Sequence, residues 1–138
     1  AFNPKYLKKM RTKINKKYDF VFNTRYGKNA GSDDDTLLTY VGNKIFTFIC
    51  NVLFKLNLSD VLFTYVMGST KVFRSLKINS QDFSFCVELP IKAKFKKYKF
   101  TNLPTHERAR IAGKKKVNEF KDGFLILISI IRLFIFKK

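Results

Sequence analysis

The chain has 138 residues, a length that suits one ordinary domain and excludes a large multidomain enzyme. Hydrophobic residues make up 46% of it and sixteen residues are Phe, which excludes an intrinsically disordered chain. The formal net charge of +18 predicts an anionic partner, which composition leaves open as nucleic acid, a phosphorylated small molecule or an anionic membrane surface.

The first residues predict a surface helix, a strand and a loop. Pro4 suits a first helical position, and apolar residues follow it at helical spacing among lysines, so we expect a short amphipathic helix over residues 4–17. Residues 18–23 are a short run of β-forming residues and predict a strand. Arg25 follows that strand, at the end where open α/β sheets bind ligands. Residues 27–35 predict a loop.

Residues 36–56 predict a well-buried helix, because their apolar side chains fall on one helical face. Three consecutive acids, residues 33–35, come just before it and suit the positive end of a helix dipole. A metal site is the less favoured interpretation, because consecutive side chains project in different directions. The residues of the apolar face are Ile45, Phe48, Ile49, Val52, Leu53 and Leu56.

The middle of the chain predicts turns at residues 57–60 and 68–71, an extended segment between them, and a short helix or connector over residues 72–76. Residues 83–95 predict a helix with Pro90 inside it or kinking it. Glu88 lies within an apolar run of that helix and is costly to bury without a partner. Two interpretations stay open: an ion pair with a neighbouring Lys or Arg, or a carboxylate that faces a site.

The two cysteines, Cys50 and Cys86, each lie in an apolar run without CxxC spacing. They predict buried thiols in a reducing compartment.

A strand predicted over residues 98–103 leads into a strongly basic loop at residues 104–123. The loop contains Arg108, Arg110, Gly113 and three consecutive lysines, residues 114–116. Arginine offers a planar fork of donors to phosphate oxygens, lysine offers a mobile charge, and glycine lets the backbone approach closely. The pattern predicts a loop that closes over phosphate; a solvated basic loop is the alternative.

The last segment, residues 120–136, is apolar nearly all round. Its uninterrupted part is shorter than the roughly 20 residues that span a bilayer, and Arg132 lies near its middle. We expect a helix that lies in a membrane interface or packs against the domain.

In this order the segments resemble the second half of a family 2 glycosyltransferase, most closely the dolichyl-phosphate and polyprenyl-phosphate sugar transferases. The resemblance covers residues 2–133 and rests on the strand before Arg25, Leu-Ser-Asp, Asp-Phe-Ser-Phe-Cys-Val-Glu-Leu, and Glu-Arg-Ala-Arg-Ile-Ala-Gly-Lys-Lys-Lys followed by Lys-Asp-Gly. It implies an α/β fold, the C-terminal portion of a GT-A fold. Residues 1–120 would form the acceptor-side half of the catalytic domain, and residues 121–138 a C-terminal apolar helix.

The family's Asp-x-Asp metal motif would precede residue 1, so we expect the chain to be a fragment. The resemblance therefore implies a divalent metal, Mg or Mn, whose ligands lie mostly outside this chain.

The resemblance also implies site residues. Asp60 and Glu88 match acids beside the reaction centre, and Arg25 matches the Arg that contacts the acceptor phosphate. Lys71, in the turn that stands for the family's Gly-Phe-Arg, is assigned to the same phosphate. The donor diphosphate is assigned to Arg108, Arg110, Gly113, Lys115 and Lys116.

The implied function is transfer of a sugar from a nucleotide-diphosphate donor to an acceptor, either a polyprenyl phosphate or a glycan hydroxyl, at the cytoplasmic face of a membrane. Two alternatives stay open. A basic nucleic-acid-binding module would explain the charge and the aromatic residues, but the sequence has no RRM, KH or zinc-finger signature. A peripheral membrane protein without catalysis is the other.

Overall fold

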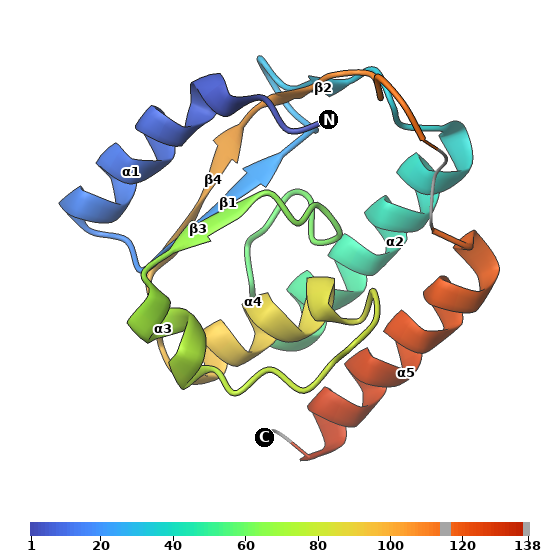
Figure 1. Cartoon of the computed structure of the whole chain (residues 1–138). Coiled ribbons are helices and arrows are strands. Elements are labelled where there is room, and N and C mark those ends of the chain that lie inside the picture. The colour runs from blue at the N-terminus through green and yellow to red at the C-terminus, as the bar shows by residue number, and fades with distance from the viewer. Residues whose placement is uncertain (114–116, 137–138) are drawn as a thin grey trace.

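A computed structural model of the chain describes residues 1–113 and 117–136 and confirms the mixed α/β class (Figure 1). The helices and the three longer strands lie close to the segments in which the sequence predicts them, whereas two short strands, residues 31–32 and 106–107, lie in segments predicted as loops. The elements are η1 (Pro4–Tyr6), α1 (Leu7–Lys16), β1 (Phe20–Thr24), β2 (Gly31–Ser32), α2 (Leu37–Phe54), β3 (Val66–Gly68), α3 (Thr70–Ser75), α4 (Phe85–Phe95), β4 (Phe100–Pro104), β5 (His106–Glu107) and α5 (Glu119–Phe136).

A three-stranded sheet of order β3-β1-β4 lies at the centre of the fold. Its middle strand, β1, is antiparallel to β3 and parallel to β4, and all five of its residues are buried. A second, two-stranded sheet pairs β2 with β5 in parallel. The parallel pairing brings the carboxyl ends of β1 and β4 to the same edge, where Thr105 donates its backbone N–H to the carbonyl of Thr24 at 2.9 Å.

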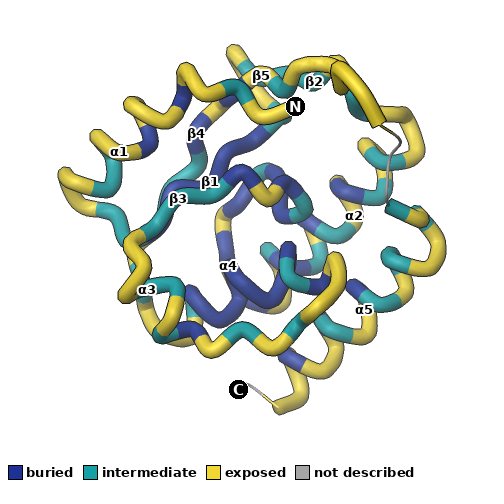
Figure 2. Tube along the Cα trace, viewed as in Figure 1, coloured by how far each residue is buried: buried dark blue, intermediate teal, exposed yellow. Residues whose placement is uncertain are grey.

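The two faces of the sheet are covered by different helices. Side chains alternate along a strand, so Val21 of β1 packs on one face with Met10 of α1, and Phe20 and Phe22 pack on the other. On that second face α4 lies against the sheet, and α2 and α5 lie beyond it (Figure 1). Figure 2 shows that α4 is buried along most of its length, whereas α1, α2 and α5 expose their outer sides. The helix predicted over residues 83–95 is thus confirmed as the central helix of the core.

Helix α2 is confirmed in position but not in orientation. Its start is fixed by reciprocal hydrogen bonds between Thr36 and Thr39, and its end by Lys55 in the left-handed conformation. The face expected to be buried is instead largely exposed, with Phe48 68% and Val52 60% accessible. The prediction that α2 is well buried was wrong, because a different face points inward. The buried residues of α2 are Asn43, Thr47, Cys50 and Phe54.

Gly68 provides a test of the sheet packing. A Cβ atom built there would lie 2.7 Å from the ring of Phe20, whereas one built at Gly42, within α2, would meet nothing within 4 Å. We expect Gly68→Ala to lower the free energy of unfolding by about 1 to 3 kcal/mol through overpacking. Gly42→Ala should raise it by up to about 1 kcal/mol, because alanine favours a helix interior. Urea denaturation measures both, and equal effects of the two substitutions would contradict this packing.

Candidate functional site

The site is built on Arg25, the residue that directly follows β1. Its guanidinium group binds the carboxylate of Asp60 in a bidentate pair, with Nε 2.8 Å from Oδ2 and Nη2 3.0 Å from Oδ1. The backbone N–H of Arg25 donates to the same carboxylate at 3.0 Å. Asp60 is buried, and the Arg25 side chain is only 13% exposed. The pair therefore fixes the guanidinium group at the end of the strand.

Helix α2 completes this arrangement with its polar inward face. The side-chain amide of Asn43 donates to Asp60 and, at 3.2 Å, to the hydroxyl of Tyr26. The hydroxyl of Thr47, one turn further on, donates to the side-chain oxygen Oδ1 of Asn43 and accepts the backbone N–H of Val61, both at 3.1 Å. Each carboxylate oxygen of Asp60 already accepts two hydrogen bonds from Arg25 and Asn43, so Asp60 positions Arg25.

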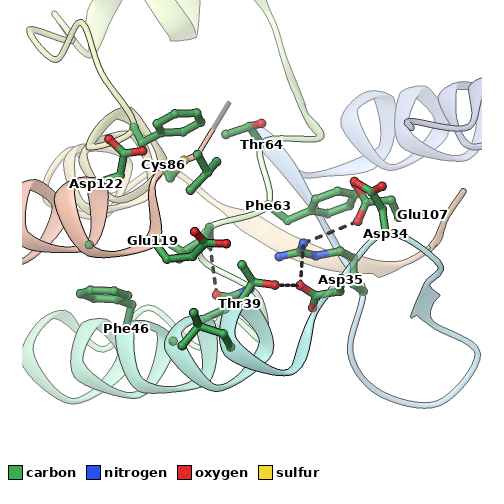
Figure 3. A pocket seen from close by; sticks show the side chains of 18 of the residues that line it. Asp34, Asp35, Thr39, Phe46, Phe63, Thr64, Cys86, Glu107, Glu119 and Asp122 are labelled. Carbon is green, nitrogen blue, oxygen red and sulfur yellow. Dashed lines mark hydrogen bonds and ion pairs between the residues drawn. The ribbon is translucent and has the colours of Figure 1, made fainter. Parts of the chain in front are cut away.

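A pocket of about 650 Å³ opens beside Arg25, between α2 and α5 (Figure 3). Phe46 and Gly42 of α2 line one wall, and Gly123 and Ile126 of α5 line another. Phe63 contributes an aromatic wall and carries the Arg25 guanidinium group 4.7 Å from its ring centre. The pocket thus combines apolar walls with a small set of charged groups, as ligand sites commonly do.

Acidic residues gather around this pocket although the chain as a whole is strongly basic. Five of its ten acidic residues line the pocket. Figure 3 shows Asp34 and Glu107 close to Phe63, and Glu119 and Asp122 belong to α5. A pocket for inorganic phosphate alone would not need them, because carboxylates repel phosphate. Carboxylates accept hydrogen bonds from hydroxyl groups, so the mixture suits a ligand that carries both phosphate and hydroxyls. The five are Asp34, Asp35, Glu107, Glu119 and Asp122.

Two arginines line the pocket, and both contact carboxylates. Nη1 of Arg25 lies 3.5 Å from Glu107 and 3.9 Å from Asp35. Nη2 of Arg110 lies 2.9 Å from Asp34, and this hydrogen bond holds the pKa of the Asp34 carboxyl below its ordinary value. Burial disfavours the charged form of Arg25, but the hydrogen bonds and charge of Asp60 outweigh it, so its pKa is raised. The Arg25 guanidinium group therefore stays charged at physiological pH.

Burial also sets the state of Cys86, which lines the pocket, and of Tyr26, which is hydrogen-bonded to the pocket residue Asp35. It raises the pKa of Cys86 to about 12, so its thiol stays protonated and is a poor nucleophile at neutral pH. Burial and a 2.6 Å hydrogen bond from Tyr26 to Asp35 raise the pKa of the Tyr26 phenol. Neither group suits nucleophilic catalysis there.

The structure brings together four of the residues that the sequence assigned to the site. Arg25, Arg110 and Gly113 line the pocket, and Asp60 lies directly behind Arg25. Gly113 has a φ of 84°, a conformation that glycine adopts without strain. Lys115 and the neighbouring Lys116, both assigned to the donor diphosphate, lie outside the described residues.

Three other assigned residues lie elsewhere. Lys71 belongs to α3, which follows the antiparallel strand β3 and so lies at the opposite end of the sheet from Arg25. Arg108 contacts the backbone of Ala1 and Phe2 rather than the pocket. This geometry corrects the assignment of Lys71 to the same phosphate as Arg25, and the assignment of Arg108 to the same ligand site as Arg110.

Glu88 also does not face the pocket. Its carboxylate lies 2.6 Å from Nζ of Lys92 and accepts the backbone N–H groups of Asn79 and Ser80 at 2.9 and 2.8 Å. Of the two interpretations of Glu88, the structure shows the ion pair. The carboxylate holds the segment between α3 and α4 onto α4, which is a structural role and not contact with a substrate.

The sequence missed Asn43, Tyr26, Asp35 and Glu107 as site residues. Asn43 gave a usable signal, because it is a polar residue within an otherwise apolar helix. Glu107 gave none: its place depends on the pairing of β5 with β2, where Ser32 donates to its carboxylate at 2.7 Å.

Comparison of the chain with protein-family profiles, curated protein sequences and solved structures finds no match. Among residues 1–113 and 117–136, no group of three or more His, Cys, Asp or Glu side chains is arranged to hold a metal ion.

The Arg25–Asp60 pair can be tested by a double-mutant cycle. Asp60→Ala leaves a guanidinium group largely buried without its partner and should lower the free energy of unfolding by about 3 to 5 kcal/mol. Arg25→Met combined with Asp60→Ala leaves no unpaired buried charge and should recover part of that loss, with Arg25→Met as the second single variant of the cycle. Urea denaturation of the wild type, both single variants and the double variant measures the coupling. A loss of less than about 1 kcal/mol for Asp60→Ala would be typical of an exposed pair and would contradict the geometry.

Glu88 provides a test at low pH. Burial raises its pKa, but hydrogen bonds from Lys92, Ser80 and Asn79 outweigh burial, so its pKa lies below the ordinary 4.5. A carboxylate whose pKa is lowered by folding adds stability above its unfolded pKa and loses it as the pH falls through the folded value. The wild type should therefore lose stability more steeply than Glu88→Gln as the pH falls below about 4.5. Urea denaturation at several pH values compares the slopes, and parallel slopes would mean that the carboxylate is not held as described.

Proposed function

We propose that this chain forms the acceptor-side portion of a glycosyltransferase of the GT-A type, which moves a sugar from a nucleotide-diphosphate donor to a polyprenyl phosphate or a glycan hydroxyl. One observation carries the proposal: Arg25 and Arg110, far apart in the sequence, line a single pocket together with carboxylates. The family resemblance assigns Arg25 to the acceptor phosphate and Arg110, together with Arg108, to the donor diphosphate. The mixed α/β architecture is compatible with it.

The two arginines are held differently, which fits two different tasks. Arg25 is mostly buried and tied to Asp60 through two side-chain hydrogen bonds, so its position is set before a ligand arrives. Arg110 and its partner Asp34 are 36% and 25% exposed, and such a pair contributes little stability. Arg110 can therefore exchange Asp34 for a phosphate at small cost. Arg25 suits a fixed acceptor site and Arg110 suits a loop that closes on the donor.

The chemistry of sugar transfer needs this arrangement of charge. When the nucleoside diphosphate leaves the sugar carbon, negative charge grows on its phosphate oxygens, and a nearby guanidinium group stabilises that charge most in the transition state. In this proposal Arg110, three residues before Gly113, does so when the loop closes. A phosphate acceptor arrives ionised and needs no strong base, which agrees with an Asp60 that is already fully hydrogen-bonded.

Carboxylates in the pocket have a separate task in this proposal. Glu107, Asp35 and Asp122 can accept hydrogen bonds from sugar hydroxyls, and the ring of Phe63 offers an apolar wall to a sugar face. The divalent metal of the family would be held mostly by residues outside this chain, and no step here is assigned to it.

The nucleic-acid alternative relies on net charge and not on this pocket. Acids that line a cavity repel a phosphate backbone, so RNA would bind on other surfaces, such as the lysine-rich α1. Sugar transfer would therefore depend on Arg110 in the pocket, whereas RNA binding would depend as much on Arg11 of α1.

Arg110→Ala tests the proposal, with Arg11→Ala as a matched control. Both remove one exposed arginine, but Arg11 lies on α1, away from the pocket. We expect Arg110→Ala to weaken binding of magnesium pyrophosphate, measured by isothermal titration calorimetry, about tenfold, which corresponds to about 1.4 kcal/mol. Arg11→Ala should leave it within about twofold, because a distant exposed charge acts only through a screened field.

In a polypeptide that also contains the donor-binding half, Arg110→Ala should lower kcat for sugar transfer about a hundredfold. Loss of one hydrogen-bond donor to the transition state has an effect of this size. Equal pyrophosphate affinities of the two variants, together with equal losses of single-stranded RNA binding, would favour the nucleic-acid module and contradict the transferase.

A further inference from the structure

Helix α2 exposes a continuous apolar stripe that the fold leaves uncovered. Val41, Ile45, Phe48 and Val52 recur at the spacing of one helical face, and they are 45%, 53%, 68% and 60% exposed. Its opposite face, around Asn43, is buried against the fold. A soluble helix normally turns its apolar stripe inward, so this reversed orientation needs a reason.

Helix α5 shows the same feature. Phe120, Phe124, Ile131 and Ile135 lie on one face and are 83%, 64%, 48% and 64% exposed. The opposite face of α5 is the one that packs into the core, and its buried residues are Ile126, Ile130 and Leu133.

The two stripes lie side by side. Gly123 near the start of α5 lies against the ring of Phe46, and Phe134 near its end lies 6.0 Å, between ring centres, from Phe54. The helices therefore run in the same direction and pack along their length (Figure 1). Since both turn their buried faces to the same core, their exposed stripes point the same way. We call this two-helix surface the outer face; it comprises Val41, Ile45, Phe48, Val52, Phe120, Phe124, Ile131 and Ile135.

The edges of the outer face are basic. Helical spacing places Lys44 and Lys55 beside the α2 stripe, on the side away from α5. By the same spacing Lys121 and Arg132 lie beside the α5 stripe, on the side away from α2. The acidic residues of α5, Glu119 and Asp122, line the pocket. An apolar surface between two rows of cations complements an anionic lipid surface, with apolar groups at the acyl boundary and cations at the phosphates.

Length and composition alone would allow α2 to span a bilayer. Its inward face excludes that placement within this fold, because Asn43 and Thr47 are hydrogen-bonded to Asp60 and Val61. A helix with one face bonded to a domain and the other apolar lies in the interface and does not cross it.

We infer that the outer face docks on the surface of an anionic bilayer, with α2 and α5 lying flat in the interface. A second copy of the chain is the less suitable occupant, because a symmetric contact would bring equal rows of cations together in a protein that already carries +18. The inference does not depend on sugar transfer. It does place the pocket, which is lined by both helices, next to the lipid surface.

Vesicle sedimentation tests the docking with a matched pair of variants. Phe48→Asp lies in the outer face, and Leu7→Asp lies at an exposed position of α1, so each replaces one exposed apolar side chain by one negative charge. We expect the wild type to bind phosphatidylcholine vesicles that contain phosphatidylglycerol, and to bind pure phosphatidylcholine vesicles weakly. Binding to the anionic vesicles should weaken as the salt concentration rises. Phe48→Asp should lower the partition coefficient about tenfold or more, the effect of removing one large buried apolar group. Leu7→Asp should change it less than about threefold.

Two double variants, each lacking two cations, distinguish this docking from unspecific attraction of a basic protein to anionic lipid. Lys44→Gln with Arg132→Gln removes two cations from the edges of the outer face, and Lys8→Gln with Arg11→Gln removes two from α1. Stronger loss of vesicle binding for the first double variant supports the inference. Equal losses, or equal binding of Phe48→Asp and Leu7→Asp, would overturn it. So would a wild-type dimer in sedimentation velocity that Phe48→Asp dissociates while vesicle binding stays unchanged. The assay contains no nucleotide or sugar, so its outcome is independent of pyrophosphate binding and of sugar transfer.

Discussion

The hydrogen-bonded pair of Arg25 and Asp60 is the constraint on which the site and the orientation of α2 depend. Removing two charges from water is costly, and their attraction compensates only where further hydrogen bonds satisfy both groups. The structure provides these from the backbone N–H of Arg25 and from the amide of Asn43. One buried carboxylate thus connects the end of β1, helix α2 and the segment that leads to β3.

The same pair explains why α2 exposes its apolar side. Because Asn43 must reach Asp60, and Thr47 must reach both Asn43 and the backbone of Val61, this face of the helix is turned inward. The stripe around Phe48 then has no place in the core and faces outward. Exposed apolar surfaces of this extent are uncommon on monomeric soluble proteins and usually serve contact with something else. A polar network inside and an apolar surface outside are therefore two consequences of one orientation.

Sequence patterns predicted the elements but not every orientation. Strand β1, the central helix α4 and the surface helix α1 follow from periodicity and composition, since these signals are local. The orientation of α2 does not, because periodicity assumes that an apolar stripe faces the core; the contrary signal was Asn43 in an apolar helix. For the site, Arg25 could be predicted from its place after a strand. Glu107 could not, because only the pairing of two short, distant strands brings it to the pocket.

The distribution of charge gives the surface and the pocket different tasks. A net charge of +18 attracts anions toward every face of the molecule, so attraction alone cannot select a ligand. Selection of one ligand requires a site in which cations are held in fixed positions and neighbouring carboxylates repel anions that lack hydroxyl groups. The pocket meets both conditions, because Arg25 is held by Asp60 while Asp35 and Glu107 stand beside it. A bare phosphate gains one cation there and meets two carboxylates, whereas a ligand with a phosphate and hydroxyl groups can satisfy all three. In the proposed function, specificity therefore depends on the acids of the pocket as well as on its arginines.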